Sequence, residues 1–80
     1  NRVTLIGRTE TRTARRFVLA ADGVDVPVEC ARPPEQGERV AVEGALRSRD
    51  GSLYVEAIAL DVLPRHMLNM LMARKQVLVQ

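Results

Sequence analysis

The stretch VAVEGALRSRDGSLYVEA, Val40 to Ala57, holds two runs in which apolar and polar residues alternate, with Arg49-Asp50-Gly51-Ser52 between them. A period of two is typical of a half-buried β-strand, and an Asp-Gly pair between two such runs is typical of a tight turn. The stretch therefore predicts a long β-hairpin. The residues that share the inner side of its first strand are Val40, Val42, Gly44 and Leu46.

The second strand of this hairpin changes phase along its length. It starts with Leu53 and Val55 facing inward, but farther on the large apolar residues are Ile58, Leu60 and Val62. A phase change near residues 56–57 predicts a β-bulge or a sharp bend. A bend of this kind lets a short sheet curl and close.

Three earlier segments, residues 3–8, 16–19 and 24–31, show the same alternation. Residues 9–13 between the first two are expected to form a turn or a loose hairpin tip, and Asp22-Gly23 predicts a second turn. Pro27 cannot donate a ladder hydrogen bond, so its strand is expected at an edge or at a bulge. The loop RPPEQGE, residues 32–38, is the clearest break in the chain and is too short for much of a helix.

These five strands predict an all-β domain over residues 1–63, and closure into a barrel would remove sheet edges that otherwise aggregate. After Pro64, the segment RHMLNMLMARKQ favours a helix. With the final VLVQ, residues 64–80 carry more apolar surface than a small barrel buries, so we expect this appendage to pack on a second subunit or a partner protein. Its interface residues are predicted to be Met67, Leu68, Met70, Leu71 and Met72.

The composition argues against several classes of function. The single Cys30 cannot form an intramolecular disulfide, and His66, the one histidine, has no cysteine or second histidine near it, so we expect no metal and no other cofactor. No Ser-His-Asp grouping or carboxylate pair suggests catalysis, so we expect a protein that is not an enzyme. Because the chain has no disulfide framework, we expect it in the reducing cytoplasm. The longest near-apolar run, residues 67–73, is too short to cross a bilayer, which predicts no membrane partner.

Charge is distributed unevenly along the chain. Residues 1–20 hold five arginines and one acid, a net charge of +4, whereas residues 21–63 hold four arginines and nine acids, a net charge of −5. Eleven of the twelve basic residues are arginine, whose planar guanidinium binds phosphate through paired hydrogen bonds and stacks on bases. The pattern predicts a basic face, and a coding bias toward arginine is the alternative explanation.

The segments NRVTLIGR, FVLA, VPVECA and GERVAVEGALRSRDGSLYVEAIALDVL, taken in order, resemble the bacterial single-stranded DNA-binding protein family, including primosomal replication protein N. The resemblance covers residues 1 to about 63. It implies an oligonucleotide-binding (OB) fold that binds single-stranded DNA in replication, repair or recombination. It also implies a homo-oligomer, a dimer or tetramer, that works with replication or repair proteins at the nucleoid.

The chain departs from the family pattern in several places. Ala31 and Arg32 stand where the family usually places a stacking aromatic residue, and the family's long helix is reduced to the loop at Pro33-Pro34. The hairpin after the second strand is cut to residues 21–23, and the family's acidic tail is not found among these 80 residues. Weak stacking is therefore expected.

The candidate binding residues are outward-facing arginines and one aromatic residue. They are Arg2, Thr4, Arg8, Arg12, Arg16, Arg47, Arg49 and Tyr54. The arginines are expected to bind backbone phosphates. Tyr54 is expected to stack on a base, with packing on the barrel surface as its alternative, and Phe17 is expected in the core, with stacking as its alternative. A solvated face carrying ion pairs with Glu43 and Glu56 is the competing interpretation of the arginines. A protein-interaction module that kept the barrel and lost the ligand is the competing function.

Overall fold

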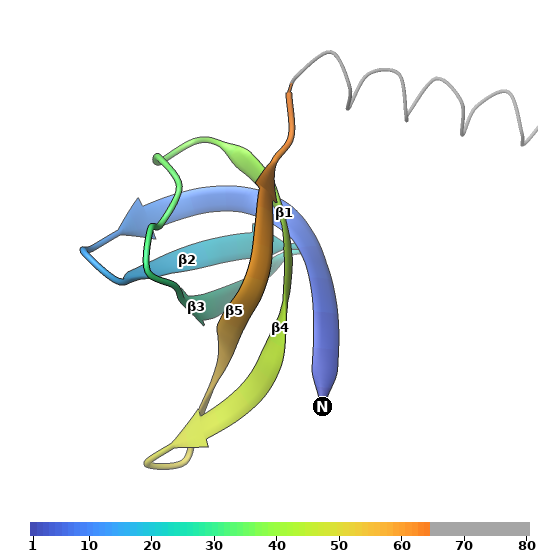
Figure 1. The fold of residues 1–80 in the computed structure, drawn as a ribbon. Coiled ribbons are helices and arrows are strands. Elements are labelled where there is room, and N and C mark those ends of the chain that lie inside the picture. The colour runs from blue at the N-terminus through green and yellow to red at the C-terminus, as the bar shows by residue number, and fades with distance from the viewer. Residues whose placement is uncertain (65–80) are drawn as a thin grey trace, which may run out of the picture.

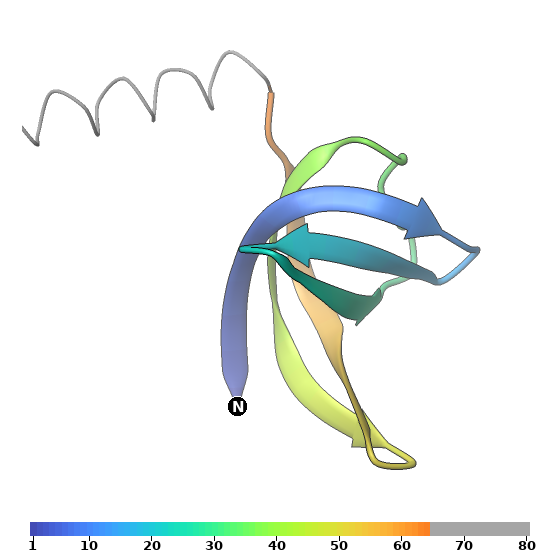
Figure 2. The ribbon, with the colours of Figure 1, turned by 180° about the vertical axis from the view of Figure 1, so that it is seen from behind.

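A computed structural model describes residues 1–64, which form five strands and no helix. The strands are β1 (Arg2–Arg12), β2 (Arg16–Ala21), β3 (Val24–Glu29), β4 (Arg39–Arg49) and β5 (Ser52–Val62). They close into a barrel in the order β1-β2-β3-β5-β4 (Figures 1 and 2). The predicted all-β, five-stranded barrel is confirmed, and its topology is consistent with an OB fold. The predicted C-terminal helix and its interface residues lie outside the described residues.

β1 closes the barrel because it pairs with two different strands. Its first part, from Arg2 to Arg8, runs antiparallel to β4, and its last part, from Arg8 to Arg12, runs antiparallel to β2. The expected turn at residues 9–13 is therefore wrong: the strand continues to Arg12, and the link to β2 is shorter. An extra residue between Thr9 and Thr11 interrupts the ladder with β2, and such a bulge lets a strand bend and continue.

The β4–β5 hairpin has the predicted tight turn and the predicted bulge. Asp50 and Gly51 both have positive φ, of 52° and 80°, as a two-residue hairpin turn requires. Glu43 pairs with Ala59 and Gly44 with Ala57, so β5 carries one extra residue, Ile58. Ile58 points out of the barrel and is 55% exposed, which corrects its expected inward position.

The tip of this hairpin projects beyond the rest of the barrel, on the same side as the N-terminus (Figures 1 and 2). Leu46 and Leu53 have the inward phase that the alternation predicts, but they lie where no opposite wall covers them. Leu53 is consequently 60% exposed. Val62, at the other end of β5, is also largely exposed, whereas Leu60 packs against the core as expected.

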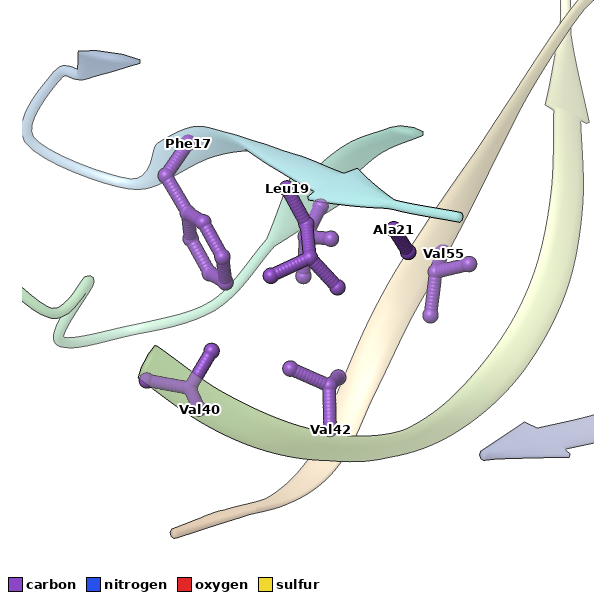
Figure 3. Close-up of a cluster of buried hydrophobic side chains, with 7 residues drawn as sticks. Phe17, Leu19, Ala21, Val40, Val42 and Val55 are labelled. Atoms are coloured by element: carbon purple, nitrogen blue, oxygen red, sulfur yellow. The ribbon is translucent and has the colours of Figure 1, made fainter. Parts of the chain in front are cut away.

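The core lies between β2 and β3 on one side and β4 and β5 on the other. Figure 3 shows the side chains of β2 directed across the barrel toward those of β4. Phe17 is 1% exposed, which confirms it as a core residue and leaves no ring face for a base. The buried hydrophobic residues are Phe17, Leu19, Ala21, Val28, Val40, Val42 and Val55.

Two inward-facing glycines allow strands to approach closely. A Cβ atom on Gly7 would overlap the carbonyl oxygen of Ala20 in β2, and a Cβ atom on Gly44 would overlap the carbonyl oxygen of Glu56 in β5. Gly7 lies where β1 passes from β4 to β2, and Gly44 lies beside the β5 bulge. Both glycines therefore serve the curvature that closes the barrel.

The loop between β3 and β4 covers one end of the barrel, where it runs up from the end of β3 to the start of β4 (Figure 1). Pro33 and Pro34 are both buried. The loop is tied to β1 through the backbone of Thr9, which donates to the carbonyl of Glu38 at 2.8 Å and accepts from the amide of Gly37 at 2.7 Å. As expected, this segment forms no helix.

Thr9 lies under this loop with its hydroxyl group fully buried and without a hydrogen-bond partner among the described residues. A buried, unpaired hydroxyl costs about 1–3 kcal/mol, and valine has nearly the same shape without the polar group. We expect Thr9→Val to raise the free energy of unfolding by about 1 kcal/mol, measured by urea denaturation. Thr4→Val on the exposed face of β1 is the control and should change the free energy of unfolding by less than about 0.5 kcal/mol. A loss of stability in Thr9→Val would contradict this prediction.

No helix among the described residues has the length and apolar character needed to cross a membrane.

Candidate nucleic-acid interface

The outer face of the barrel carries most of the predicted binding residues. The β1–β4 register pairs Arg2 with Ala45 and Thr4 with Glu43, so these outward residues lie beside the outward side of β4. Arg8 pairs with Arg39 at the opposite end of the same ladder. The structure therefore places Arg2 and Thr4 toward the projecting hairpin, and it separates Arg8 from them.

A glutamate from β3 holds two arginines from different parts of the chain. The Oε2 atom of Glu29 accepts a hydrogen bond from Nη2 of Arg16, at the start of β2, and a second from Nη1 of Arg49, at 2.9 Å. Arg49 is the last residue of β4. The start of β2 and the tip of the β4–β5 hairpin are thereby joined over the end of β3.

A third ion pair lies beside the two that Glu29 forms. β3 and β5 run parallel and pair Glu29 with Glu56, so the two carboxylates are neighbours. Nη2 of Arg47 lies 3.2 Å from Oε1 of Glu56. We call these five residues, Arg16, Glu29, Arg47, Arg49 and Glu56, the arginine–glutamate cluster. Three cations and two anions give it a net charge of +1.

Tyr54 lies at the edge of this cluster, in the first part of β5 and opposite Arg47 of β4. The guanidinium carbon of Arg49 lies 4.8 Å from the centroid of the Tyr54 ring, which is a cation–π contact. Nη2 of Arg49 also donates to the Tyr54 hydroxyl at 3.1 Å. Tyr54 is half-buried, and Arg49 covers one face of its ring.

The charges of the cluster are stabilised mutually. The hydrogen bond from Arg16, followed by that from Arg49, holds the pKa of Glu29 below the ordinary value of a glutamate, although partial burial opposes the shift. The hydrogen bond to Glu29 raises the pKa of Arg49 above its ordinary value. Glu29 is therefore ionised throughout the physiological pH range, and its charge counts against any anion that approaches the two arginines.

An open hollow of about 330 Å³ lies next to the cluster, where β3 and β5 diverge after their short parallel pairing. Burial raises the pKa of the Cys30 thiol, so this thiol stays protonated and is a poor nucleophile. The hollow thus adds a concave surface with one arginine and two carboxylates, and its thiol is not a reactive group. It is lined by Arg15, Glu29, Cys30, Ala31, Glu56 and Ala57.

The chain matches no protein-family model and no curated protein. Four predicted residues, Arg16, Arg47, Arg49 and Tyr54, lie together in or beside the cluster. Arg12 is not among them, because it pairs with Glu35 of the loop at 3.0 Å.

The sequence did not predict one feature of the site, the role of Glu29, and left a second open, the ion pairs of the arginines. The sequence did not predict Glu29 as a site residue. Its outward phase on β3 indicated an exposed carboxylate, but the parallel β3–β5 pairing that places Glu29 beside β5 is not visible in the sequence. The expected ion pairs of the competing interpretation are present: Arg47 pairs with Glu56, and Arg2 lies 3.7 Å from Glu43. Such exposed pairs contribute little to stability, so they leave the arginines available to a stronger anion.

Proposed function

We propose that this chain is a non-catalytic OB-fold module that binds single-stranded DNA across the arginine–glutamate cluster. The observation that carries the proposal is that Arg16 of β2 lies on one outer face with Arg47, Arg49 and Tyr54 of the β4–β5 hairpin, where Glu29 of β3 joins the two parts. The resemblance to bacterial single-stranded DNA-binding proteins supports it, and extends the proposal to a role in replication, repair or recombination as a homo-oligomer at the nucleoid.

The chemistry of the cluster suits a single strand better than a duplex groove. Guanidinium groups bind phosphate oxygens along a backbone, and an aromatic ring stacks on an unpaired base of any sequence. Tyr54 is the only aromatic side chain of the described residues that reaches the surface, because Phe17 is buried. Affinity per subunit is therefore modest, and binding by several linked subunits would raise it.

Removal of the Tyr54 ring tests the proposal directly. A stacked base contributes on the order of 1–3 kcal/mol, so we expect Tyr54→Ala to weaken binding of a labelled thymine strand of about 30 nucleotides by at least about fivefold. Fluorescence anisotropy at two salt concentrations measures this, with a duplex of the same length for comparison. Tyr54→Phe keeps the ring and should retain most of the affinity. No binding by the unaltered protein at low salt would refute the proposal.

Arg47 tests the phosphate contacts separately. Each phosphate contact to a single strand contributes about 0.7 to the slope of log affinity against log salt, so Arg47→Ala should make this slope shallower by about that amount. Arg39→Ala is the matched control, because it removes the same charge at the other end of the β1–β4 ladder. Equal slopes for the two variants would show that only net charge matters.

A protein-interaction module is the second candidate function. The observation that favours it is the projecting hairpin, whose Leu46 and Leu53 are exposed although they have the inward phase. Leu53→Asp together with Leu46→Asp should then abolish self-association or partner binding, measured by analytical ultracentrifugation. If the same variant still binds the thymine strand, the two surfaces are separate.

A further inference from the structure

Glu29 differs from the other carboxylates of the described residues because two arginines share it. Its Oε2 atom accepts from both Arg16 and Arg49, whereas Glu35, Glu43 and Glu56 each pair with one arginine. Two guanidinium groups that converge on one anionic oxygen form the arrangement that proteins use to hold a phosphate. In this structure the anionic oxygen comes from the protein itself.

The two arginines have unused donors that face solvent. Their side chains are 54% and 56% exposed, whereas the side chain of Glu29 is 23% exposed. A guanidinium has five N–H donors, and Glu29 occupies one from each arginine. A phosphate group offers more acceptor oxygens than one carboxylate oxygen does, so it can engage donors that Glu29 leaves free.

We infer, on the basis of the proposed function, that Arg16 and Arg49 form the site for one backbone phosphate of the bound strand, and that Glu29 occupies this site in the free protein. The carboxylate and the phosphate compete for the same donors and repel each other. Glu29 therefore lowers the affinity of the protein for the strand. Until the strand binds, Glu29 also holds the two arginines in place.

The contact between Arg49 and Tyr54 links phosphate binding to base stacking. In the free protein Arg49 lies over one face of the Tyr54 ring and donates to its hydroxyl. A phosphate bound by Arg49 in place of Glu29 therefore lies next to the ring, where a neighbouring base of the strand can stack. Loss of the Glu29 charge should consequently favour both contacts.

The test is Glu29→Gln, which keeps the shape of the side chain and removes its charge. Because an exposed charge pair contributes modestly, we expect the variant to bind the thymine strand about three- to fivefold more tightly at low salt. The log–log salt slope should become steeper by up to about 0.7. Asp25→Asn is the matched control: it changes the net charge equally on the same strand, and Asp25 forms no ion pair with any residue that the structure describes.

Two results overturn the inference while the proposed function stands. If the unaltered protein binds the strand and Glu29→Gln gains no more affinity than Asp25→Asn, the effect of Glu29 is only its contribution to net charge. If Glu29→Gln binds more weakly, Glu29 positions the arginines for the strand and does not compete with it. A thermal melt of each variant confirms that the barrel is folded.

A titration with inorganic phosphate separates this inference from the proposed function. The Nε–H signals of Arg16 and Arg49 are followed by NMR in the unaltered protein and in Glu29→Gln. If neither protein binds the strand, the proposed function fails. The phosphate site then still stands if phosphate shifts both signals more strongly in Glu29→Gln, and it is overturned if the signals do not respond in either protein.

Discussion

Gly44→Ala is expected to lower the free energy of unfolding by about 3 kcal/mol or more, because the added methyl group has no space. It would overlap the carbonyl oxygen of Glu56 and lie 2.6 Å from Cγ1 of Val55, a core side chain. The carbonyl belongs to the backbone of the neighbouring strand, so only a shift of β5 could relieve the overlap. A domain of this size has a total stability of about 3–10 kcal/mol, so this loss amounts to roughly a third of that stability or more.

Urea denaturation followed by circular dichroism measures this effect, with Gly51→Ala as the control. Gly51 has no atom within 4 Å of the position of an added Cβ, and its only obstacle is its positive φ. A left-handed residue other than glycine costs about 1–2 kcal/mol, so Gly51→Ala should be clearly milder. Equal losses in the two variants would mean that the close approach of β4 and β5 is unimportant.

Phe17→Ala is expected to lower the free energy of unfolding by about 3–5 kcal/mol, because it opens a cavity in the core. Phe17 is the largest of the fully buried side chains and projects from β2 toward β4 (Figure 3). Its ring fills the space next to Val40, and no other side chain in this small core is large enough to replace it. Urea denaturation again provides the measurement.

Phe17→Leu separates the core role of this residue from base stacking. Leucine keeps most of the apolar volume, so its cost should stay below about 1.5 kcal/mol. A buried ring cannot stack on a base, so this variant should bind the thymine strand as well as the unaltered protein does. A selective loss of binding without loss of stability would contradict the assignment of Phe17 to the core.

The closed barrel was predicted from the cost of open sheet edges, and the five strands were predicted from the alternation of apolar and polar residues. Two positions show where it failed. At Thr9 the strand continued although threonines and polar residues suggested a turn, because β1 changes partner there and the ladder with β2 stabilises residues up to Arg12. At Leu53 the phase was correct but the burial was not, because burial depends on whether an opposite strand covers the residue.

Of the candidate site, the sequence predicted the arginines and Tyr54 but not how they are arranged. Which arginines gather, and around which acid, depends on the parallel pairing of Glu29 with Glu56, a contact between strands that are not neighbours in sequence. Local pattern carries no information on such a pairing. For this reason the prediction placed Arg8 in one set with Arg16, Arg47 and Arg49, whereas the structure groups Arg16 with Arg49 and places Arg8 beside Arg39.

The buried Pro33-Pro34 pair has a consequence for the entropy of folding. A proline ring fixes one backbone dihedral angle, so two successive prolines leave this segment with few conformations even in the unfolded chain. Ordering the loop against the end of the barrel therefore loses less conformational entropy than ordering the same length of ordinary chain. The barrel end is covered by a segment that is largely preorganised before folding begins.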